Sequence, residues 1–259
     1  MNILTLLFVL PCLVIGNYAV VSNGTSELII QTMLQDSAPK YIEQADGSYG
    51  GLAIDIMQAL ERADGTLTFQ FDRLNTPFPR IVHELQHNRI DAFIGAIYTE
   101  ARTELFDYLQ PSLYHTQNRL VVRKQDSNLN IQSLNDIVSL GRDGVILVDR
   151  GTAHQSWLQN VPGLRVDGGA NTREQNLLKL LSERGRFYYS TDLGVLHTAR
   201  AMGIEHQIHF LPLVLKEEPQ YLVVSKAMPP EARQRLQRAL EQIHASGELA
   251  QIRARYFFN

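Results

Sequence analysis

Short apolar runs alternate with amphipathic stretches along the first part of the chain. Residues 27–34 (ELIIQTML), 68–71 and 90–98 (IDAFIGAIY) are rich in apolar side chains and have the length of buried strands. Residues 54–62 and 76–88 lie between these runs, and their apolar positions recur with the period of a helix. The resulting order of strand, helix, strand, helix, strand predicts a mainly parallel sheet with helices on both faces.

The same alternation begins again after a strand at residues 119–124. The helices predicted in this part begin at Ser133, Thr152, Thr172 and residue 193, and two more close the chain, one from Pro229 or Pro230 and one from residues 246–248. The strands predicted among them span residues 145–148, 164–166, 186–191, 208–215 and 220–225. This repetition predicts a second α/β unit, and a chain of 259 residues is long enough to bury two moderate cores.

Residues 3–15 (ILTLLFVLPCLVI) form an apolar run of signal-peptide length that is too short to span a membrane. We therefore expect residues 1–19 to be a cleaved signal peptide and the mature protein to be periplasmic, or otherwise secreted. Cys12 is the only cysteine, and it follows Pro11 where a lipoprotein signal has a small residue, so no lipid anchor is expected. The mature chain would have no thiol, which excludes a disulfide framework and a cysteine nucleophile.

The charge balance excludes one class of partner. The chain has 24 Lys and Arg residues against 27 Asp and Glu residues, a net charge of −3, and 44% hydrophobic residues. These values are ordinary for a globular protein and are not basic enough to indicate nucleic-acid binding.

Residues 83–87 (HELQH) match the H-E-x-x-H motif of zinc proteases. His83 and His87 could share a metal, with Glu84 as the general base. The same helix, however, has an apolar stripe formed by Phe78, Ile81, Val82 and Leu85. The histidines and the glutamate of the motif are predicted to lie on the opposite face. No third metal ligand is evident in the sequence, so a solvated helix face is favoured over a zinc hydrolase.

Several polar residues lie at predicted junctions between a strand and a helix, where the ligands of open parallel sheets collect. Arg102 follows the strand at 90–98, and its guanidinium can hold a carboxylate by two parallel hydrogen bonds. Gly151 and Thr152 precede a helix, where backbone N–H groups and a hydroxyl can bind an anion. Asp192 ends another strand and can pair with an ammonium group. Each position taken alone also fits a surface ion pair or an ordinary helix cap.

The order of these motifs resembles that of the family-three extracellular solute-binding proteins, the amino-acid-binding type of periplasmic binding protein. The resemblance runs from about residue 28 to residue 257. Its motifs are DGSYGGLAIDIMQAL for the loop and first helix, LQHNRIDAFIGAIYTEAR for the L-x-x-G-x-x-D strand and T-x-x-R loop, DRGTAHQSW for the G-T turn, RFYYSTDLGVL for the strand before the ligand aspartate, and ALEQIHASGELAQIRARYF for the C-terminal helices.

The resemblance implies an α/β, two-lobe periplasmic binding protein of type II. Each lobe would be a mainly parallel sheet flanked by helices, with the ligand in the cleft between the lobes. Lobe 1 would comprise residues 25–116 and 213–259, and lobe 2 would comprise residues 117–212. The chain would then cross between the lobes twice, near residues 113–119 and 208–215.

The resemblance also implies roles for particular residues. Arg102 would hold an α-carboxylate with help from Thr152, and Asp192 would bind an α-ammonium group. The backbone from Gly95 to Thr99 would line the site. The full set of ligand-binding candidates is Tyr41, Gly95, Thr99, Arg102, Gly151, Thr152 and Asp192.

The implied function is capture of a small carboxylate ligand, an amino acid or related organic acid, for an ABC permease in the inner membrane. The protein would be a monomer and not an enzyme, with no cofactor and no metal. Ala53, Ile97 and Phe187 replace polar residues common in the family, so a less polar amino acid or another small carboxylate stays open. Three alternatives also stay open: an enzyme resembling cyclohexadienyl dehydratase, which would act on a prephenate-like acid, a sensory module that presents its ligand to a membrane receptor, and the zinc hydrolase.

Overall fold

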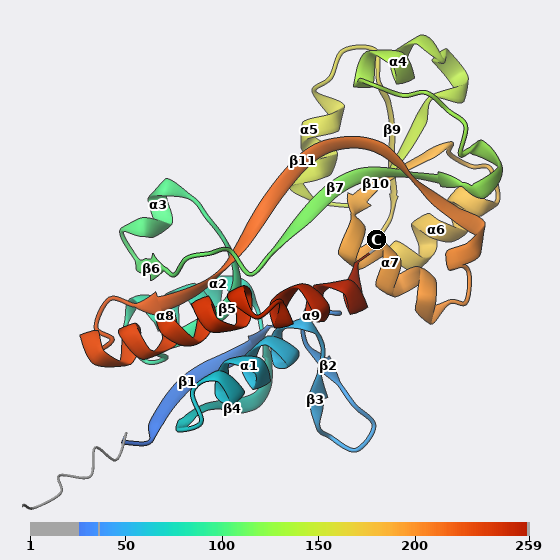
Figure 1. Ribbon diagram of the computed structural model, residues 1–259. Coiled ribbons are helices and arrows are strands. Elements are labelled where there is room, and N and C mark those ends of the chain that lie inside the picture. The colour runs from blue at the N-terminus through green and yellow to red at the C-terminus, as the bar shows by residue number, and fades with distance from the viewer. Residues whose placement is uncertain (1–25, 36, 258–259) are drawn as a thin grey trace, which may run out of the picture.

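The computed structural model describes residues 26–35 and 37–257, which form two lobes joined by two long strands (Figure 1). The connecting strands are β7 (Tyr114–Arg123) and β11 (Ile208–Ser225), and they run side by side between the lobes. The predicted signal peptide, residues 1–19, lies outside the described residues. The two-lobe α/β fold predicted from the sequence is confirmed.

Lobe 1 contains elements from both ends of the described chain. Its strands are β1 (Leu28–Gln35), β4 (Leu67–Thr76) and β5 (Ala92–Ile97), and β1 pairs with β4 in parallel. Its main helices are α1 (Leu52–Ala63), α2 (Phe78–Gln86), α8 (Pro230–Ala245) and α9 (Glu248–Tyr256). Figure 1 shows the blue α1 beside the red α8 and α9, and α1 contacts both.

The loop after β1 is fixed against the start of α1. The backbone N–H of Leu52 donates to the Pro39 carbonyl (3.0 Å), and that of Ala53 donates to the Lys40 carbonyl (2.9 Å). Gly51 precedes the helix with φ of 109°, and a Cβ atom there would lie 2.6 Å from both carbonyl oxygens. Because only glycine permits this approach, the loop that carries Lys40 is held at the carboxyl end of β1.

Lobe 2 repeats the parallel arrangement around β8 (Val145–Asp149). Its neighbours are β9 (Arg165–Ala170) and β10 (Phe187–Thr191), both parallel to it. The helices of this lobe are α4 (Leu134–Ser139), α5 (Ala153–Gln159), α6 (Arg173–Leu181) and α7 (Asp192–Ala201), with 3-10 turns η1 (Lys124–Asp126), η2 (Gly141–Asp143) and η3 (Glu205–Gln207). The predicted helix starts are confirmed, because Ser133, Thr152 and Thr172 are the N-cap residues of α4, α5 and α6.

The sequence-based prediction of two separate strands at 208–215 and 220–225 is wrong. β11 is one strand of 18 residues, and the polar segment between the two predicted strands pairs antiparallel with β7. Residues 216–219 look like a loop because they are charged and end in proline. Backbone hydrogen bonds to β7 nevertheless keep these residues extended. A strand that connects two lobes needs no buried apolar face, so charged residues are tolerated in it.

The connecting strands merge parts of both lobes into one hydrogen-bonded sheet of seven strands, in the order β5-β11-β7-β10-β8-β9. The short β6 (Phe106–Tyr108) pairs with β11 at its edge. β6, the hairpin of β2 (Ile42–Glu43) and β3 (Tyr49–Gly50), and α3 (Glu100–Thr103) were not predicted individually. Elements of two to four residues are too short to show a periodic pattern.

The buried apolar residues form separate clusters in the two lobes. One cluster draws on residues 30–114 and 222–252, while two smaller clusters draw on residues 120–211. Leu213 and Leu215 of β11 pack against one of the lobe 2 clusters. Among the described residues, Leu193 of α7 is the one lobe 2 residue that belongs to the apolar cluster of lobe 1. The two lobes are therefore in contact at this residue.

The longest described helix, α8, has 16 residues and one apolar face. Its buried side chains are Ala232, Arg235, Leu236, Ala239, Leu240 and Ile243, and the opposite face is charged. Within residues 26–35 and 37–257, no helix combines the length and apolar character needed to cross a membrane.

Candidate functional site

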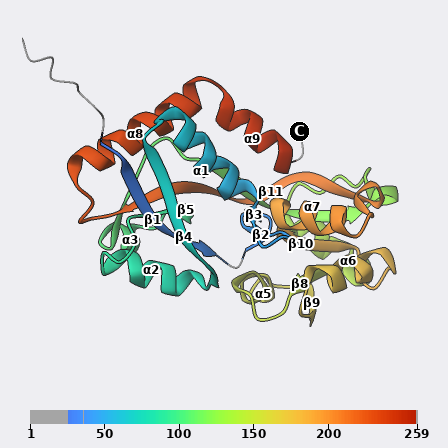
Figure 2. The ribbon, with the colours of Figure 1, turned by 90° about the horizontal axis from the view of Figure 1, so that it is seen from below.

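A cavity of about 280 Å³ lies where the two lobes meet. Lobe 1 lines it with the loop after β1, with β5 and with the starts of α2 and α3, and lobe 2 lines it with the starts of α6 and α7. The connecting strands β7 and β11 contribute further lining residues. Figure 2 shows β11 running from one lobe to the other. This volume lies near the lower end of the range for small-molecule sites, which is roughly 300–1,000 Å³.

Arg102 is positioned by α3, just beyond the carboxyl end of β5. Its guanidinium carbon lies 4.7 Å from the centre of the Phe78 ring, and one terminal nitrogen donates to the Ile97 carbonyl (3.1 Å). The alternative of a surface arginine paired with a neighbouring carboxylate does not fit, because no described carboxylate forms an ion pair with Arg102. Asp107, a carboxylate five positions after Arg102 in the chain, pairs instead with Lys226 and Arg233. Arg102 therefore presents unpaired positive charge to the cavity.

Lys40 brings a second cation to the cavity from the loop after β1. Its ammonium group donates to the side chain of Gln35 (2.5 Å) and lies 3.5 Å from the Gly95 carbonyl oxygen. Burial lowers the pKa of Lys40 to about 8, because these neutral partners do not replace the water that a charged ammonium loses. At neutral pH the ammonium is still charged, and an anion in the cavity would stabilise it.

Arg173 supplies a third cation, from the first residue of α6. Its guanidinium packs on the backbone of Gly194 in α7, where a Cβ atom would lie 2.7 Å from the guanidinium carbon. The Nε atom of Arg173 is buried without a hydrogen-bond partner, and no ion pair with another described residue is present. Any side chain larger than glycine at position 194 would displace this guanidinium from the cavity wall.

The only acidic side chain among the described lining residues is Glu218 of β11. One of its oxygens pairs with the ammonium of Lys216 (2.6 Å), and the other accepts from the amide of Asn118 (3.3 Å). Its negative charge is therefore already balanced outside the group of Lys40, Arg102 and Arg173. The cavity is electropositive and suits an anionic ligand.

Gly95 of β5 lines the cavity at a position where a larger residue would not fit. It has φ of 91°, and a Cβ atom there would lie 2.5 Å from the hydroxyl oxygen of Tyr114. That hydroxyl is buried and has no hydrogen-bond partner in the described structure. Burial raises the pKa of Tyr114 well above its usual value, so the group remains a neutral donor that can serve a ligand.

Asp192 lies beside the cavity, between the lining residues Thr191 and Leu193. One carboxylate oxygen accepts from the backbone N–H groups of Gln117 (3.1 Å) and Leu193 (2.7 Å). Burial raises the pKa of Asp192, although these two hydrogen bonds oppose the shift. A nearby ammonium group would stabilise the ionised carboxylate.

The other predicted ligand-binding residues lie outside the cavity wall. Thr152 caps α5 and accepts from the N–H of Gln155 (3.2 Å), while the exposed Gly151 donates to the side chain of Gln155. Thr99 is exposed at the start of α3. Tyr41 is buried, and its hydroxyl donates to the Ile94 carbonyl (3.0 Å). Of the seven candidates the structure brings Gly95 and Arg102 into the cavity wall and Asp192 beside it, so ligand contact stays a prediction for all seven.

Four residues that line the cavity were not among the predicted ligand-binding residues: Lys40, Tyr114, Arg173 and Glu218. Lys40 follows a predicted strand, so the rule that ligands collect at the carboxyl ends of strands could have identified it. Arg173 follows a predicted helix cap, which is a weaker signal. Tyr114 and Glu218 belong to the connecting strands, and their approach to the cavity depends on how the lobes are joined.

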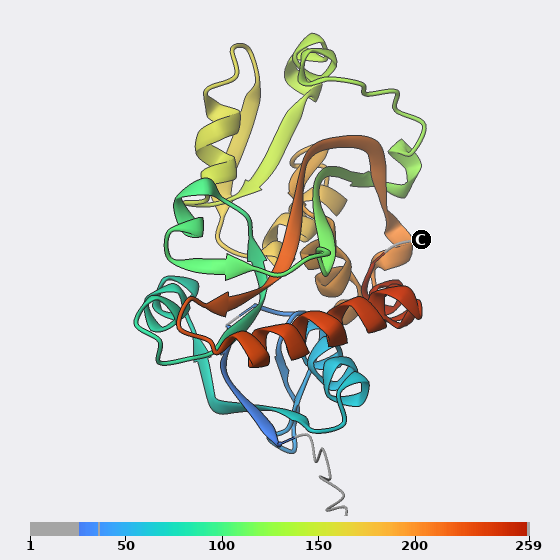
Figure 3. The same cartoon turned by 60° about the vertical axis from the view of Figure 1, so that its left-hand side comes forward.

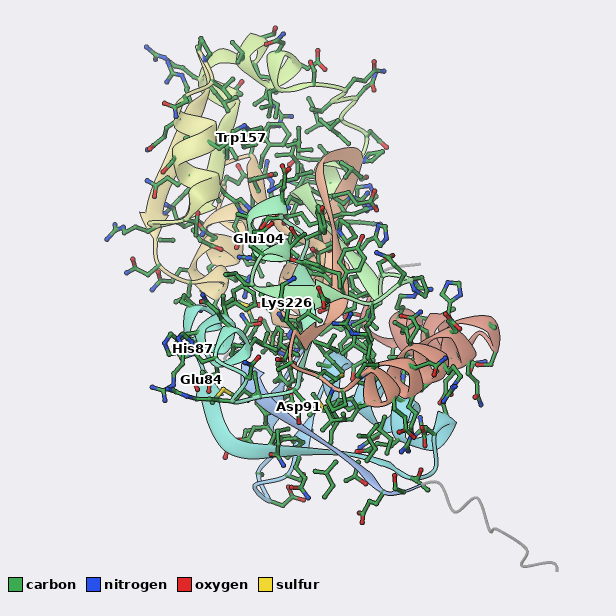
Figure 4. All side chains as sticks on the ribbon, turned by 90° about the vertical axis from the view of Figure 1, so that its left-hand side faces the viewer. Glu84, His87, Asp91, Glu104, Trp157 and Lys226 are labelled. Carbon is green, nitrogen blue, oxygen red and sulfur yellow. The ribbon has the colours of Figure 1, made fainter. Side chains whose placement is uncertain are left out.

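The H-E-x-x-H stretch lies on α2, at the outer edge of lobe 1 (Figure 4). The rings of His83 and His87 stack with centres 4.1 Å apart, and Nδ1 of His87 is 2.8 Å from the His83 carbonyl oxygen. The expectation that Glu84 faces solvent is wrong: its side chain is 8% exposed, and its carboxylate contacts Arg80 and Arg89. In the described part of the chain, no group of three His, Cys, Asp or Glu side chains could hold a metal ion.

Replacing His83 and His87 together with alanine is expected to leave the fold and ligand binding nearly unchanged. Both side chains lie on the surface of α2 and outside the cavity, and such substitutions change the free energy of unfolding by about 0.5 kcal/mol or less. Denaturant unfolding and metal analysis of the purified proteins measure the two quantities. One equivalent of zinc in the wild type that is lost in the double variant would restore the zinc-hydrolase hypothesis.

Comparison with known proteins agrees with this geometry. The family model for bacterial extracellular solute-binding proteins, family 3, matches residues 29–259. No curated protein sequence gives a significant match.

Solved structures show the same two-lobe fold at low sequence identity. A Bacillus subtilis protein described as an amino-acid ABC transporter extracellular-binding protein is 15% identical, with a TM-score of 0.72, and the match covers 89% of this chain and 98% of that chain. The L-cystine solute receptor of Neisseria gonorrhoeae is 18% identical, with a TM-score of 0.70 and coverage of 89% and 93%. An ancestral cationic amino acid solute-binding protein is 19% identical, with a TM-score of 0.69 and coverage of 89% and 96%.

The family match spans nearly all of the described residues, from β1 to the end of α9. The solved structures are amino-acid binding proteins of type II, and the cavity of this protein lies where its own two α/β lobes meet. The chain therefore belongs to the bacterial extracellular solute-binding proteins, family 3.

Proposed function

We propose that this protein is exported to the periplasm, binds a small carboxylate ligand in the cavity between its lobes, and delivers it to an ABC importer. The ligand is an amino acid or a related organic acid. The observation that carries the proposal is the unpaired guanidinium of Arg102, which faces a cavity of about 280 Å³ lined by both lobes. Its family consists mostly of binding proteins without enzymatic activity, which supports binding as the function.

The chemistry of the cavity suits one end of an amino acid. The donors of Arg102 match the two oxygens of a carboxylate, and the contacts with the Phe78 ring and the Ile97 carbonyl restrict the orientation of the guanidinium. The carboxylate of Asp192, beside the cavity, can receive the ammonium group. Because Arg102 can bind a carboxylate and Asp192 can bind an ammonium group, an amino acid is favoured over a simple monocarboxylate.

Closure of the lobes would complete the site. Thr152 lies at the start of α5, and α5 and α3 are on the same side of the molecule, one on each lobe (Figure 3). Rotation about β7 and β11 would bring the α5 start toward the carboxylate held by Arg102, where the Thr152 hydroxyl and nearby N–H groups could bind it. We propose lobe boundaries near those predicted from the sequence, with the second crossing at residues 216–219 rather than at 213.

A thermal-shift screen of amino acids and small organic acids is expected to identify a ligand. A ligand that binds only the folded protein raises its stability by about 2.7 kcal/mol at one hundred times its Kd. If no amino acid or organic acid raises the melting temperature, the proposed function is wrong.

With the ligand identified, small-angle scattering should show a smaller radius of gyration in its presence. Trp157 gives a second signal, because it is the only tryptophan in the chain and is 43% exposed on α5. Its fluorescence should change on binding, and Trp157→Phe should abolish that signal without affecting the calorimetric affinity. An unchanged radius of gyration together with unchanged fluorescence would contradict closure.

A further inference from the structure

The proposed binding of one carboxylate by Arg102 leaves two cations of the cavity unused. Lys40 comes from lobe 1 and Arg173 comes from lobe 2, and both line the same cavity as Arg102. The ammonium of Lys40 contacts only neutral oxygens in the described structure, and the Nε atom of Arg173 is buried without a hydrogen-bond partner. Charges in such positions are normally paired, because burial without a partner is costly.

The described protein residues around the cavity do not supply the missing negative charge. Glu218 is the only acid among them, and it is already bound by Lys216 and Asn118. Asp192, beside the cavity, has its Oδ1 atom bound to backbone N–H groups. Counted over the described residues alone, the positive charge around the cavity therefore exceeds what a ligand with a single carboxylate can balance.

We propose that the ligand carries a second acidic group, bound by Lys40 and Arg173, so that the preferred ligands are acidic amino acids or dicarboxylic acids. This inference rests on the proposed function. Because the two cations belong to opposite lobes, the second acid would bridge the lobes and favour the closed state. The same cations would repel basic amino acids.

Titration calorimetry with pairs of acids and their amides tests the proposal. L-glutamate is compared with L-glutamine and L-aspartate with L-asparagine, because the members of each pair have the same chain length and differ in whether the second group is a carboxylate or an uncharged amide. In at least one pair the acid is expected to bind at least about tenfold more tightly, which corresponds to about 1.4 kcal/mol and to one charge-assisted hydrogen bond. Glutarate and succinate, which lack the ammonium group, show whether a dicarboxylate suffices.

Variants then test whether Lys40 and Arg173 cause the preference for the acid over the amide. Lys40→Met and Arg173→Gln are each expected to reduce the ratio of acid to amide affinity by about tenfold, while the amide binds about as well as before. Arg173→Lys should retain part of the preference, since it keeps the charge. Lys124→Met and Arg142→Gln are matched controls, because both residues lie in lobe 2 outside the cavity. Unfolding curves check that each variant is folded.

The outcomes separate this inference from the proposed function. If an amide or another neutral amino acid binds as well as or better than the acids, the second acidic site is wrong while the proposed function stands. The proposal is also wrong if Lys40→Met and Arg173→Gln keep the wild-type ratio. If no amino acid or organic acid binds at all, the proposed function and this inference both fail.

Discussion

Replacing Arg102 with alanine is expected to weaken ligand binding by about thirtyfold or more, since loss of one partner of a buried ion pair costs roughly 2–5 kcal/mol. The guanidinium lies over Phe78 at 4.7 Å and has no ion-pair partner among the described residues, so it is available to a ligand carboxylate. Closure of the lobes would remove water from that carboxylate. Titration calorimetry with the ligand from the thermal-shift screen gives the affinity.

Arg102→Lys should recover only part of the loss, because one ammonium cannot match both oxygens of a carboxylate as a planar guanidinium does. Arg80→Ala is the matched control. Arg80 is an exposed arginine of α2 that lies outside the cavity, so its loss should leave the affinity unchanged. Wild-type affinity in Arg102→Ala would show that Arg102 does not bind the ligand.

Replacing Arg235 with methionine is expected to lower the free energy of unfolding by about 3–5 kcal/mol, the cost of leaving a paired charge without its partner. The side chain of Arg235 is 6% exposed, and it donates through two nitrogens to both oxygens of Asp64, each at 2.8 Å. It also donates to the Ser26 carbonyl (2.7 Å) and the Thr66 hydroxyl (2.6 Å). This one side chain therefore ties α8 to the turn between α1 and β4 and to the start of the described chain.

Denaturant unfolding measures this effect, and Arg238→Met on the exposed face of α8 is the control, with an expected change within about 0.5 kcal/mol. If Arg235→Met lowers the free energy of unfolding by less than about 1 kcal/mol, the ion pair with Asp64 contributes little to stability. Ligand affinity should be unaffected in folded protein, because Arg235 lies outside the cavity.

The same pair predicts a loss of stability in acid. The hydrogen bond from Arg235 lowers the pKa of Asp64 to about 2 in the folded state, below its ordinary value of 3.8. A lowered pKa means that the stabilisation is complete above pH 3.8 and disappears as the pH falls toward 2. With Asp64 20% exposed, about 1–2 kcal/mol should be lost in this interval, and Arg235→Met should not show that component.

Most helices and strands could be predicted from the sequence because their signals are local. The helix caps at Ser133, Thr152 and Thr172 are set by hydrogen bonds within four residues, and all three are present in the structure. β11 was divided wrongly, because the ladder that keeps residues 216–219 extended comes from β7, about a hundred positions earlier in the chain. Local pattern carries no information about that partner.

The candidate site was predictable only in part. Gly95 lies in the carboxyl-terminal half of β5 and Arg102 follows that strand, and the carboxyl ends of strands in an α/β sheet face one edge, so their place in the cavity wall follows from chain order. Thr152 and Gly151 satisfy the same rule but lie away from the cavity, because the rule does not specify how far apart two lobes stand. Tyr41 is a neighbour of Lys40 in sequence, yet its hydroxyl turns into the core toward Ile94.

The sequence by itself determined the two α/β units, the helix caps and the family, because periodicity, capping and motif order are properties of neighbouring residues. Only the tertiary structure decided which cations share the cavity. Lys40 and Arg102 come from the β1 loop and α3 of lobe 1, whereas Arg173 comes from α6 of lobe 2, and β7 and β11 join the two lobes so that all three line one cavity. Tertiary structure also decided that Glu218 is neutralised by Lys216, which leaves the cavity positive. Electrostatic interactions depend on distance in space, and the sequence does not encode that distance locally.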